Sequence, residues 1–272
     1  MVIELYDFFG KLPEEVPTKS AFSQRRKLIK ASFFEDLFQY SSQLFYQRFP
    51  AKTWRGFRLV AVDGTGLRIP DEDWLGEYFG WHKNQHGEVP STRWLVCFDV
   101  LNQILQRVAL HPRSTAETKI ALPLVEQFGP DVLAIYDRGF NGYALPWLHL
   151  HFGSHCLVRL KKTFSPTVVY FIESGKNEGI FTSEMTYRAR QAVAACGQTI
   201  APKTCLTYRL IRVDLPTGEI EVLLTTLLDQ NTWQWKHFGT LYHHRWGIET
   251  AFFTLKSFFQ AAVFSAYTLP AV

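Results

Sequence analysis

The stretch that decides the fold lies near the C-terminus and reads Tyr242-His243-His244-Arg245-Trp246-Gly247-Ile248-Glu249, followed seven positions later by Lys256. Its tyrosine, arginine, glutamate and lysine are three, four and seven positions apart. At about 100° per residue, an α-helix places these four side chains on one narrow strip, beside an apolar strip that packs into a core. A carboxylate held among cations is typical of a site that handles metal ions and phosphates.

Two acidic motifs upstream strengthen this interpretation, because an isolated Arg-x-x-x-Glu would more simply be a surface ion pair on a helix. One β-rich apolar run leads into Asp63-Gly64, and a second, residues 132–136, leads into Asp137. Either aspartate alone would more simply cap a turn. A glycine close behind each aspartate also permits a ligand to approach the backbone closely. Together with Glu249, the two motifs predict a constellation of three carboxylates.

The chain resembles the DDE transposases of bacterial insertion sequences, in particular the group with a Tyr-x2-Arg-x3-Glu-x6-Lys (YREK) signature. The C-terminal stretch matches that signature without a gap. Val62-Asp63-Gly64-Thr65 looks like the first aspartate motif of the family, and Asp137-Arg138-Gly139-Phe140 looks like the second. The resemblance covers nearly the whole chain.

The resemblance implies an α/β fold with a ribonuclease H-like core, which is a mixed sheet flanked by helices. The apolar runs agree with that order: three strands, a helix, a strand, a helix and another strand. We expect an N-terminal helical segment (1–52), a core in two pieces (53–162 and 230–272) and a β-rich insertion (163–229). In the family, such an insertion grips the transposon end.

Phosphodiester cleavage explains why three carboxylates would be needed. The reaction places negative charge on the attacking and leaving oxygens, which two Mg²⁺ ions about 3.5–4 Å apart can stabilise. Mg²⁺ prefers hard oxygen ligands and keeps several waters, so a few carboxylates suffice, and Mn²⁺ can substitute. We assign Asp63 as the bridging ligand, with Asp137 and Glu249 each on one metal ion.

The remaining residues of the signature are expected to contact DNA. Arg245 and Lys256 would hold phosphates of the cleaved strand, and Tyr242 would donate a hydrogen bond to a phosphate oxygen. A hairpin intermediate, as found in the family, needs a flipped base stacked on an aromatic ring. The candidates for that ring are Trp246, Trp233 and Trp235, each with ordinary core packing as an equal alternative. Arg138, beside the second aspartate, is a further candidate for DNA contact.

The N-terminal part of the chain predicts one long helix, from about residue 18 to residue 49. Its first half carries a basic face suited to phosphate contact or to docking in a DNA groove, with a solvated helix face as the alternative. The cations of this face are Arg25, Arg26, Lys27 and Lys30. A second helix is expected to open at the capping-box pattern Ser114-Thr115-Ala116-Glu117 and to run toward Phe128.

The composition agrees with these expectations without deciding among them. The chain has 272 residues, a net charge of +4 and 47% hydrophobic residues, which suits a well-packed protein with a polyanionic partner. Its four cysteines form no Cys-x-x-Cys pair, so neither a zinc pattern nor a disulfide framework follows. No signal peptide or membrane-length apolar run is evident. We therefore expect a cytoplasmic protein without a membrane partner, associated with the nucleoid when bound to DNA.

The expected function is that of a transposase. It would bind the terminal inverted repeats of its element and catalyse metal-dependent strand cleavage and transfer, acting on transposon ends and target DNA as a homodimer. The chain ends at Val272, soon after the signature helix, whereas family members usually continue. The alternative is therefore a truncated, catalytically inactive derivative that binds transposon ends or inhibits full-length dimers. A non-mobile nuclease on the same core is a third reading.

Overall fold

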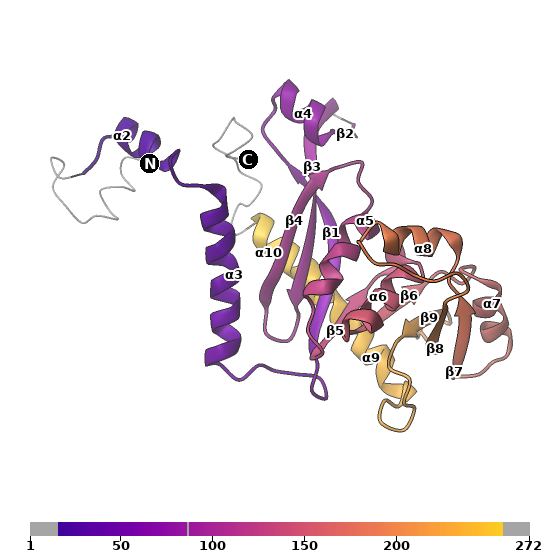
Figure 1. Ribbon diagram of the computed structural model, residues 1–272. Helices are drawn as coiled ribbons and strands as arrows, with labels where there is room; N and C mark the ends of the chain where they lie inside the picture. The colour runs from indigo at the N-terminus through magenta and orange to yellow at the C-terminus, as the bar shows by residue number, and fades with distance from the viewer. Residues whose placement is uncertain (1–15, 86, 258–272) are drawn as a thin grey trace. The chain divides into compact units, whose positions relative to one another are not determined.

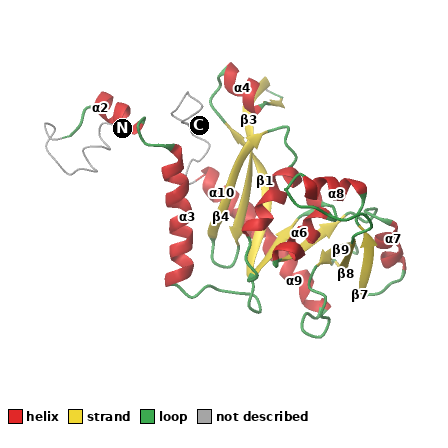
Figure 2. Ribbon diagram, in the orientation of Figure 1, coloured by secondary structure: helices red, strands yellow, loops and turns green. Residues whose placement is uncertain are grey.

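The structure is a computed structural model that describes residues 16–85 and 87–257. The chain divides into two compact units, with the boundary between Arg48 and Phe49. The first unit is helical, and the second contains one large sheet with helices on both faces (Figures 1 and 2). None of the described helices is long and apolar enough to cross a bilayer.

The first unit contains two helices, α2 (Lys19–Arg26) and α3 (Ala31–Arg48), so the prediction of one continuous helix was wrong. The last turn of α2 tightens, because the N–H groups of Leu28 and Ile29 bond to carbonyls three residues back. Cations are favoured at this end by the helix dipole, so the basic cluster ends the helix instead of occupying its middle.

The four predicted cations therefore do not share one helix face. Arg25 and Arg26 form the last turn of α2, and Lys27 is its C-cap. Lys30 lies outside both helices, immediately before α3. All four side chains are exposed.

The second unit is built on five strands in the spatial order β4-β3-β1-β5-β6. The strands are β1 (Arg58–Arg68), β3 (Gly87–Asp99), β4 (Ile104–Pro112), β5 (Val132–Tyr136) and β6 (His155–Leu160). β3 is antiparallel to both β1 and β4, whereas β1, β5 and β6 are parallel to one another. This order and these directions are those of a ribonuclease H-like core, which confirms the predicted fold class. At one end, α4 (Asp73–Phe79) leads into β2 (Trp81–Asn84), which pairs with the start of β3.

Three further strands continue the same sheet beyond β6, in the order β9-β8-β7. They are β7 (Glu178–Glu184), β8 (Cys205–Asp214) and β9 (Ile220–Thr225), accompanied by α7 (Pro166–Glu173) and α8 (Tyr187–Ala194). β9 pairs antiparallel with β6, and the remaining pairs are also antiparallel. The strands expected between residues 163 and 229 thus extend the core sheet directly (Figure 2).

Alternation along the buried strands assigns each helix to one face of the sheet. Val60 and Val62 of β1 pack in the same cluster as α5 (Glu117–Leu124) and α6 (Ala144–Phe152). Leu59 packs with α9 (Phe238–His243), and Ala61 packs with α10 (Gly247–Ser257). Because successive side chains of a strand point to opposite faces, α9 and α10 cover one face and α5 and α6 cover the other (Figure 1).

The capping box predicted at residues 114–117 does not form, although the helix does. α5 begins at Glu117 itself, after Ala116, and a short 3₁₀ turn (Val125–Gln127) continues it to Phe128. The carboxylate of Glu117 pairs with Arg93 on β3 instead of reaching back to the helix start. A charge-assisted bond to a guanidinium is stronger than a capping bond, which accounts for the difference.

We predict that stability depends most on the central strand β5, all of whose residues are buried. Leu133→Ala should lower the free energy of unfolding by about 3 kcal/mol, because a cavity opens in a site that cannot collapse. Leu150→Ala, the same change at a side chain that is 40% exposed, should cost less than about 1 kcal/mol. Urea denaturation of both variants measures the difference. Equal losses would contradict this account of the core.

Candidate active site

The two predicted aspartates lie side by side where the parallel pairing of β1 and β5 ends. Val62 of β1 is in register with Tyr136 of β5, and Asp63 and Asp137 are the residues that follow. Each aspartate accepts a hydrogen bond from a nearby glycine, Gly64 N–H or Gly139 N–H, at 2.8 Å. Asp137 follows the last residue of β5 and caps the next turn, but β1 continues through Asp63 to Arg68, so the strand end expected at Asp63 was wrong.

The predicted signature helix is an almost continuous helical segment made of three pieces. Tyr242 lies in α9, Arg245 lies in a 3₁₀ turn (His244–Trp246), and Glu249 and Lys256 lie in α10. The apolar residues Ile248 and Phe252 are buried against β1 and β3, as the helical spacing predicts. This packing holds the polar side chains of Arg245 and Lys256 against the second half of β1.

Arg245 bridges two of the three carboxylates. One terminal nitrogen lies 3.2 Å from Oδ2 of Asp63, and the other lies 3.1 Å from Oε1 of Glu249. The arginine side chain is only 8% exposed. Its guanidinium carbon lies 4.9 Å from the centre of the Trp246 ring. A buried cation thus stands between carboxylates that come from distant parts of the chain.

Lys256 connects α10 to the same strand. Its Nζ donates to Oγ1 of Thr65 at 2.6 Å and to the carbonyl oxygen of Gly66 at 2.9 Å. Burial lowers the pKa of its ammonium group. These contacts place a second cation just past Asp63 along β1.

Two buried donors of the signature lack an acceptor among the residues that the structure describes. They are the hydroxyl of Tyr242 and Nε of Arg245. Burial raises the pKa of the Tyr242 phenol to about 12, so its proton stays on the oxygen. An unmet buried donor costs roughly 1–3 kcal/mol, so an anionic acceptor brought to this place would be bound favourably.

The electrostatics of the site centre on Asp63. Burial, with smaller contributions from the carboxylates of Asp137 and Glu117, raises the pKa of Asp63 to about 6 against the opposing effects of the Gly64 N–H and Arg245. The raised pKa means mainly that the ionised carboxylate is poorly solvated. A bound cation would stabilise its ionised form.

The donor set suits a hard divalent ion, since all three predicted ligands are carboxylates. Asp137 is near enough to Asp63 for its charge to raise the pKa of Asp63. Within the described residues, however, no three acidic, histidine or cysteine side chains are placed to hold one ion together. The reason is visible at Glu249, whose carboxylate is turned to Arg245.

Several residues at the site were missed by the sequence analysis. Glu117 lies against Gly64, where an added Cβ would meet its carboxyl group. Arg159 pairs with Glu221 at 3.0 Å, and both influence the pKa of Tyr242. The only signal for Glu117 was its place in the capping-box pattern, which suggested a different role. Arg159 and Glu221 come from β6 and β9, whose pairing is not local in sequence.

The remaining predicted residues differ in exposure. Arg138 is exposed in the 3₁₀ turn Arg138–Phe140 that follows Asp137. Trp246 is 50% exposed and Trp235 is 38% exposed. Trp233 stacks on Trp54 and packs against the core, which is the alternative expected for a structural tryptophan.

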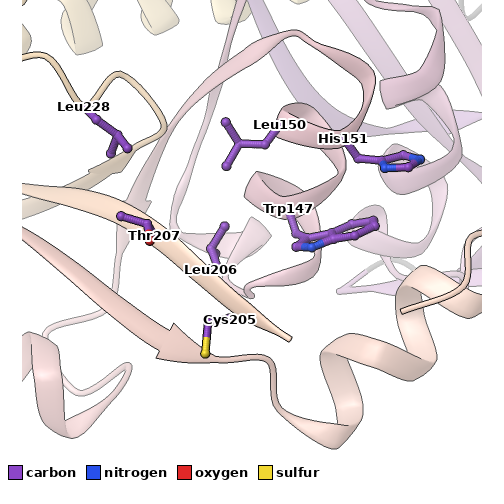
Figure 3. Close-up of a pocket in the computed structure, with 7 residues that line it drawn as sticks. All are labelled: Trp147, Leu150, His151, Cys205, Leu206, Thr207 and Leu228. Carbon is purple, nitrogen blue, oxygen red and sulfur yellow. The ribbon is translucent and has the colours of Figure 1, made fainter. Parts of the chain in front are cut away.

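A separate pocket of about 320 Å³ lies between α6 and β8. Figure 3 shows side chains from the helix and the strand around it. Its lining residues are Trp147, Leu150, His151, Cys205, Leu206, Thr207 and Leu228. None of them is a carboxylate or one of the predicted site residues, so this pocket is not the candidate active site.

We predict that Asp63→Asn stabilises the metal-free protein at neutral and higher pH. A carboxyl group whose pKa is higher in the folded state than in the unfolded state loses folding stability as pH rises from 3.8 to about 6. Asparagine avoids that loss, so the gain at pH 8 should be on the order of 2 kcal/mol and should shrink toward pH 4. Thermal unfolding in EDTA at several pH values measures it.

Asp131→Asn is the matched control. Its hydrogen bond to Arg58 lowers the pKa of Asp131, so the stability that this carboxylate contributes is present above pH 3.8 and is lost as pH falls. The control variant should therefore be less stable than the parent at pH 8. Two variants that shift in the same direction at pH 8 would contradict the electrostatic account of Asp63.

Comparison with known proteins identifies the family of the chain. The family model described as "Transposase DDE domain" matches residues 54–272. The chain is 25% identical over 259 residues to the transposase InsG for insertion sequence element IS4 of Escherichia coli (strain K12), covering 92% of this chain and 55% of that protein. It is 26% identical over 135 residues to the putative transposase InsZ of the same organism, covering 48% of this chain and 45% of that protein.

The chain therefore spans about half the length of the curated relatives it matches. Among solved structures, it is similar to the piggyBac transposase in a synaptic complex with hairpin DNA, with a TM-score of 0.47 and 8% identity. That match covers 94% of this chain and 54% of the other chain. Because the family model matches most of the sequence, the protein belongs to the DDE transposases of insertion sequences.

Proposed function

We propose that the protein binds the terminal inverted repeats of its element and catalyses metal-dependent cleavage and transfer of DNA strands. The observation that carries the proposal is the bridge from Arg245 to Asp63 and Glu249, beside Asp137. The bridge and the β1–β5 register bring three carboxylates and a buried cation to one edge of the sheet. The similarity to the transposase InsG and the putative transposase InsZ supports the same activity.

The three carboxylates are proposed to hold two Mg²⁺ ions, or Mn²⁺ in their place. Asp63 is the proposed shared ligand, and Asp137 and Glu249 complete the set. When bound, the ions supply charge stabilisation to the attacking and leaving oxygens of a phosphodiester. For Glu249 to join the set, its carboxylate must turn away from Arg245, which frees the guanidinium for another anion.

The cations and the phenol of the signature are proposed to hold the DNA strand. Arg245 has a flat guanidinium that can bind a phosphate through two parallel hydrogen bonds. The Tyr242 hydroxyl lacks an acceptor among the described residues and can donate to the same group. Lys256, fixed by Thr65 and Gly66, would contact a neighbouring phosphate. These contacts orient the strand, which is a large part of catalysis by positioning.

Exposed residues around this cluster are proposed to complete DNA recognition. Trp246 presents its ring beside Arg245 and is the proposed platform for an unpaired base. Arg138, exposed beyond Asp137, is a proposed phosphate contact. The cations around the end of α2 are proposed to bind duplex DNA, and two copies of the chain are proposed to pair two transposon ends.

A nicking assay on a labelled inverted-repeat duplex, taken from the DNA that flanks the gene, tests the proposed roles. Glu249→Gln should abolish nicking and strand joining, because a metal ligand is needed in every chemical step. Lys256→Ala should nick about 10- to 100-fold more slowly, because only positioning is lost. Arg245→Lys should restore only part of the activity, since an ammonium cannot reproduce a bidentate contact.

Lys203→Ala, a change at an exposed lysine outside the site, is the control and should nick at the parental rate. Circular dichroism melts should show that all variants fold. If Glu249→Gln nicks as fast as the parent, α10 is not the catalytic helix. If the parent binds the duplex but does not nick it with Mg²⁺ or Mn²⁺, the binding-only derivative is the correct function.

The N-terminal cations make a separate prediction. Replacing Arg25, Arg26, Lys27 and Lys30 with alanine should weaken binding to the inverted-repeat duplex and flatten its salt dependence. Each lost phosphate contact should reduce the slope of log K against log salt by about 0.9. Fluorescence anisotropy at 50–200 mM salt measures the slope. An unchanged slope would place duplex recognition elsewhere, most plausibly on the strands between residues 163 and 229.

A further inference from the structure

A second cavity lies directly behind the turn that carries Asp137. It has a volume of about 730 Å³ and lies among the 3₁₀ turn Arg138–Phe140, the start of α6, the end of β6, and helices α7 and α8. Gly139 and Phe140 form part of its wall. The same turn donates the Gly139 N–H to Asp137, so the wall of the cavity is continuous with the active site.

The charged residues of this cavity are all positive. Lys161 and Arg188 line it, and no carboxylate does. Neither cation forms an ion pair within the described ranges, and both are exposed. The pair therefore presents two positive charges on one concave surface, which suits an anionic ligand.

Hydroxyl groups add hydrogen-bond donors to the same surface. Ser165 and Thr186 line the cavity and accept capping bonds from Val168 N–H and Ala189 N–H. A hydroxyl oxygen that accepts a capping bond still carries a proton that it can donate. Thr163 contributes a further hydroxyl. Phosphate oxygens are the acceptors that such a set of cations and hydroxyls recognises.

An aromatic ring completes the lining. Phe164 is half-buried at the cavity, and its ring packs edge-on against Tyr143 with 5.2 Å between ring centres. Cations that follow a backbone, combined with an aromatic ring that stacks on a base, are the usual means of binding an unpaired nucleic-acid strand. The volume lies within the range of sites for small organic ligands and is far too small for a duplex.

We propose that this cavity binds a nucleotide of an unpaired DNA strand, with its phosphates on Lys161 and Arg188 and its base against Phe164. The inference rests on the proposed function, because the unpaired strand is the DNA strand proposed to bind at the three carboxylates. The cavity would be an additional binding site for that strand, on the far side of the turn that follows Asp137. An occupant would contact the turn that follows Asp137, because Gly139 and Phe140 line the cavity. Lys161 is tied to the same place, since its backbone N–H donates to the side chain of Asn141, the residue after the turn.

The test compares two double variants that each remove two positive charges. Lys161→Ala with Arg188→Ala removes the cations of the cavity. Lys162→Ala with Lys176→Ala removes exposed cations that do not line it. Each protein is titrated by fluorescence anisotropy against a duplex of fixed sequence, either blunt or with an unpaired extension at the 3′ end.

The parent should bind the extended duplex more tightly than the blunt one. The cavity variant should lose at least about tenfold in affinity for the extended duplex only, and its salt slope there should fall by about 1.4 for two single-strand contacts. The control variant should keep the parental preference. Phe164→Leu, which keeps an apolar side chain, should also lose about tenfold for the extended duplex alone.

The inference is overturned if the cavity variant and the control lose affinity equally, or if the loss is the same for blunt and extended DNA. It is also overturned if the parent binds blunt and extended duplexes equally while inorganic phosphate or a free mononucleotide binds the parent but not the cavity variant, because the cavity would then hold a small phosphate ligand. If the parent binds both duplexes but the cavity variant matches it, this inference fails while the proposed function stands. If the parent binds neither, both fail.

Discussion

The guanidinium of Arg245 lies between two carboxylates from opposite ends of the second unit, Asp63 on β1 and Glu249 on α10. Asp63 is largely buried, whereas Glu249 is 47% exposed, and holding these two negative charges close together beside Asp137 would be unfavourable without a cation. The arginine supplies that cation from the same helix that supplies one of the carboxylates. The packing of α10 on the sheet therefore also brings the carboxylates together.

The same arrangement bears on the proposed metal site. Burial and the neighbouring carboxylates raise the pKa of Asp63 to about 6 although Arg245 lies beside it. In the metal-free protein, Asp63 is therefore protonated below about pH 6. A divalent ion, if bound as proposed, would neutralise the carboxylates in place of that proton and in part in place of Arg245. Stability and the proposed catalysis would then place opposite demands on Asp63, as is common where active sites are preorganised.

Much of the fold and of the site could be predicted from the sequence, because the decisive signals are local. Helical spacing placed Tyr242, Arg245, Glu249 and Lys256 on one strip, and an apolar run placed Asp137 at the end of its strand. The strand before Asp63 was also predicted, but it does not end there, because pairing with β3 continues it to Arg68. The errors arose where a contact is distant in sequence. Glu117 has the spacing of a helix cap, yet Arg93 on another strand attracts its carboxylate. Pairs such as Arg159 with Glu221, and the cavity behind Asp137, depend on strands that meet only in the folded sheet.

The way in which β9 joins β6 has a consequence for how such a protein could be rebuilt or evolve. Their backbones are hydrogen-bonded, so the strands between residues 163 and 229 share one ladder with the strand next to Asp137. Removing them would leave β6 as a bare edge, open to pairing with other chains. The region is therefore a structural continuation of the sheet that carries Asp63 and Asp137, and not a separate module. A mechanical force on the strands between residues 163 and 229 would be transmitted through the β9–β6 and β6–β5 pairings to Asp137.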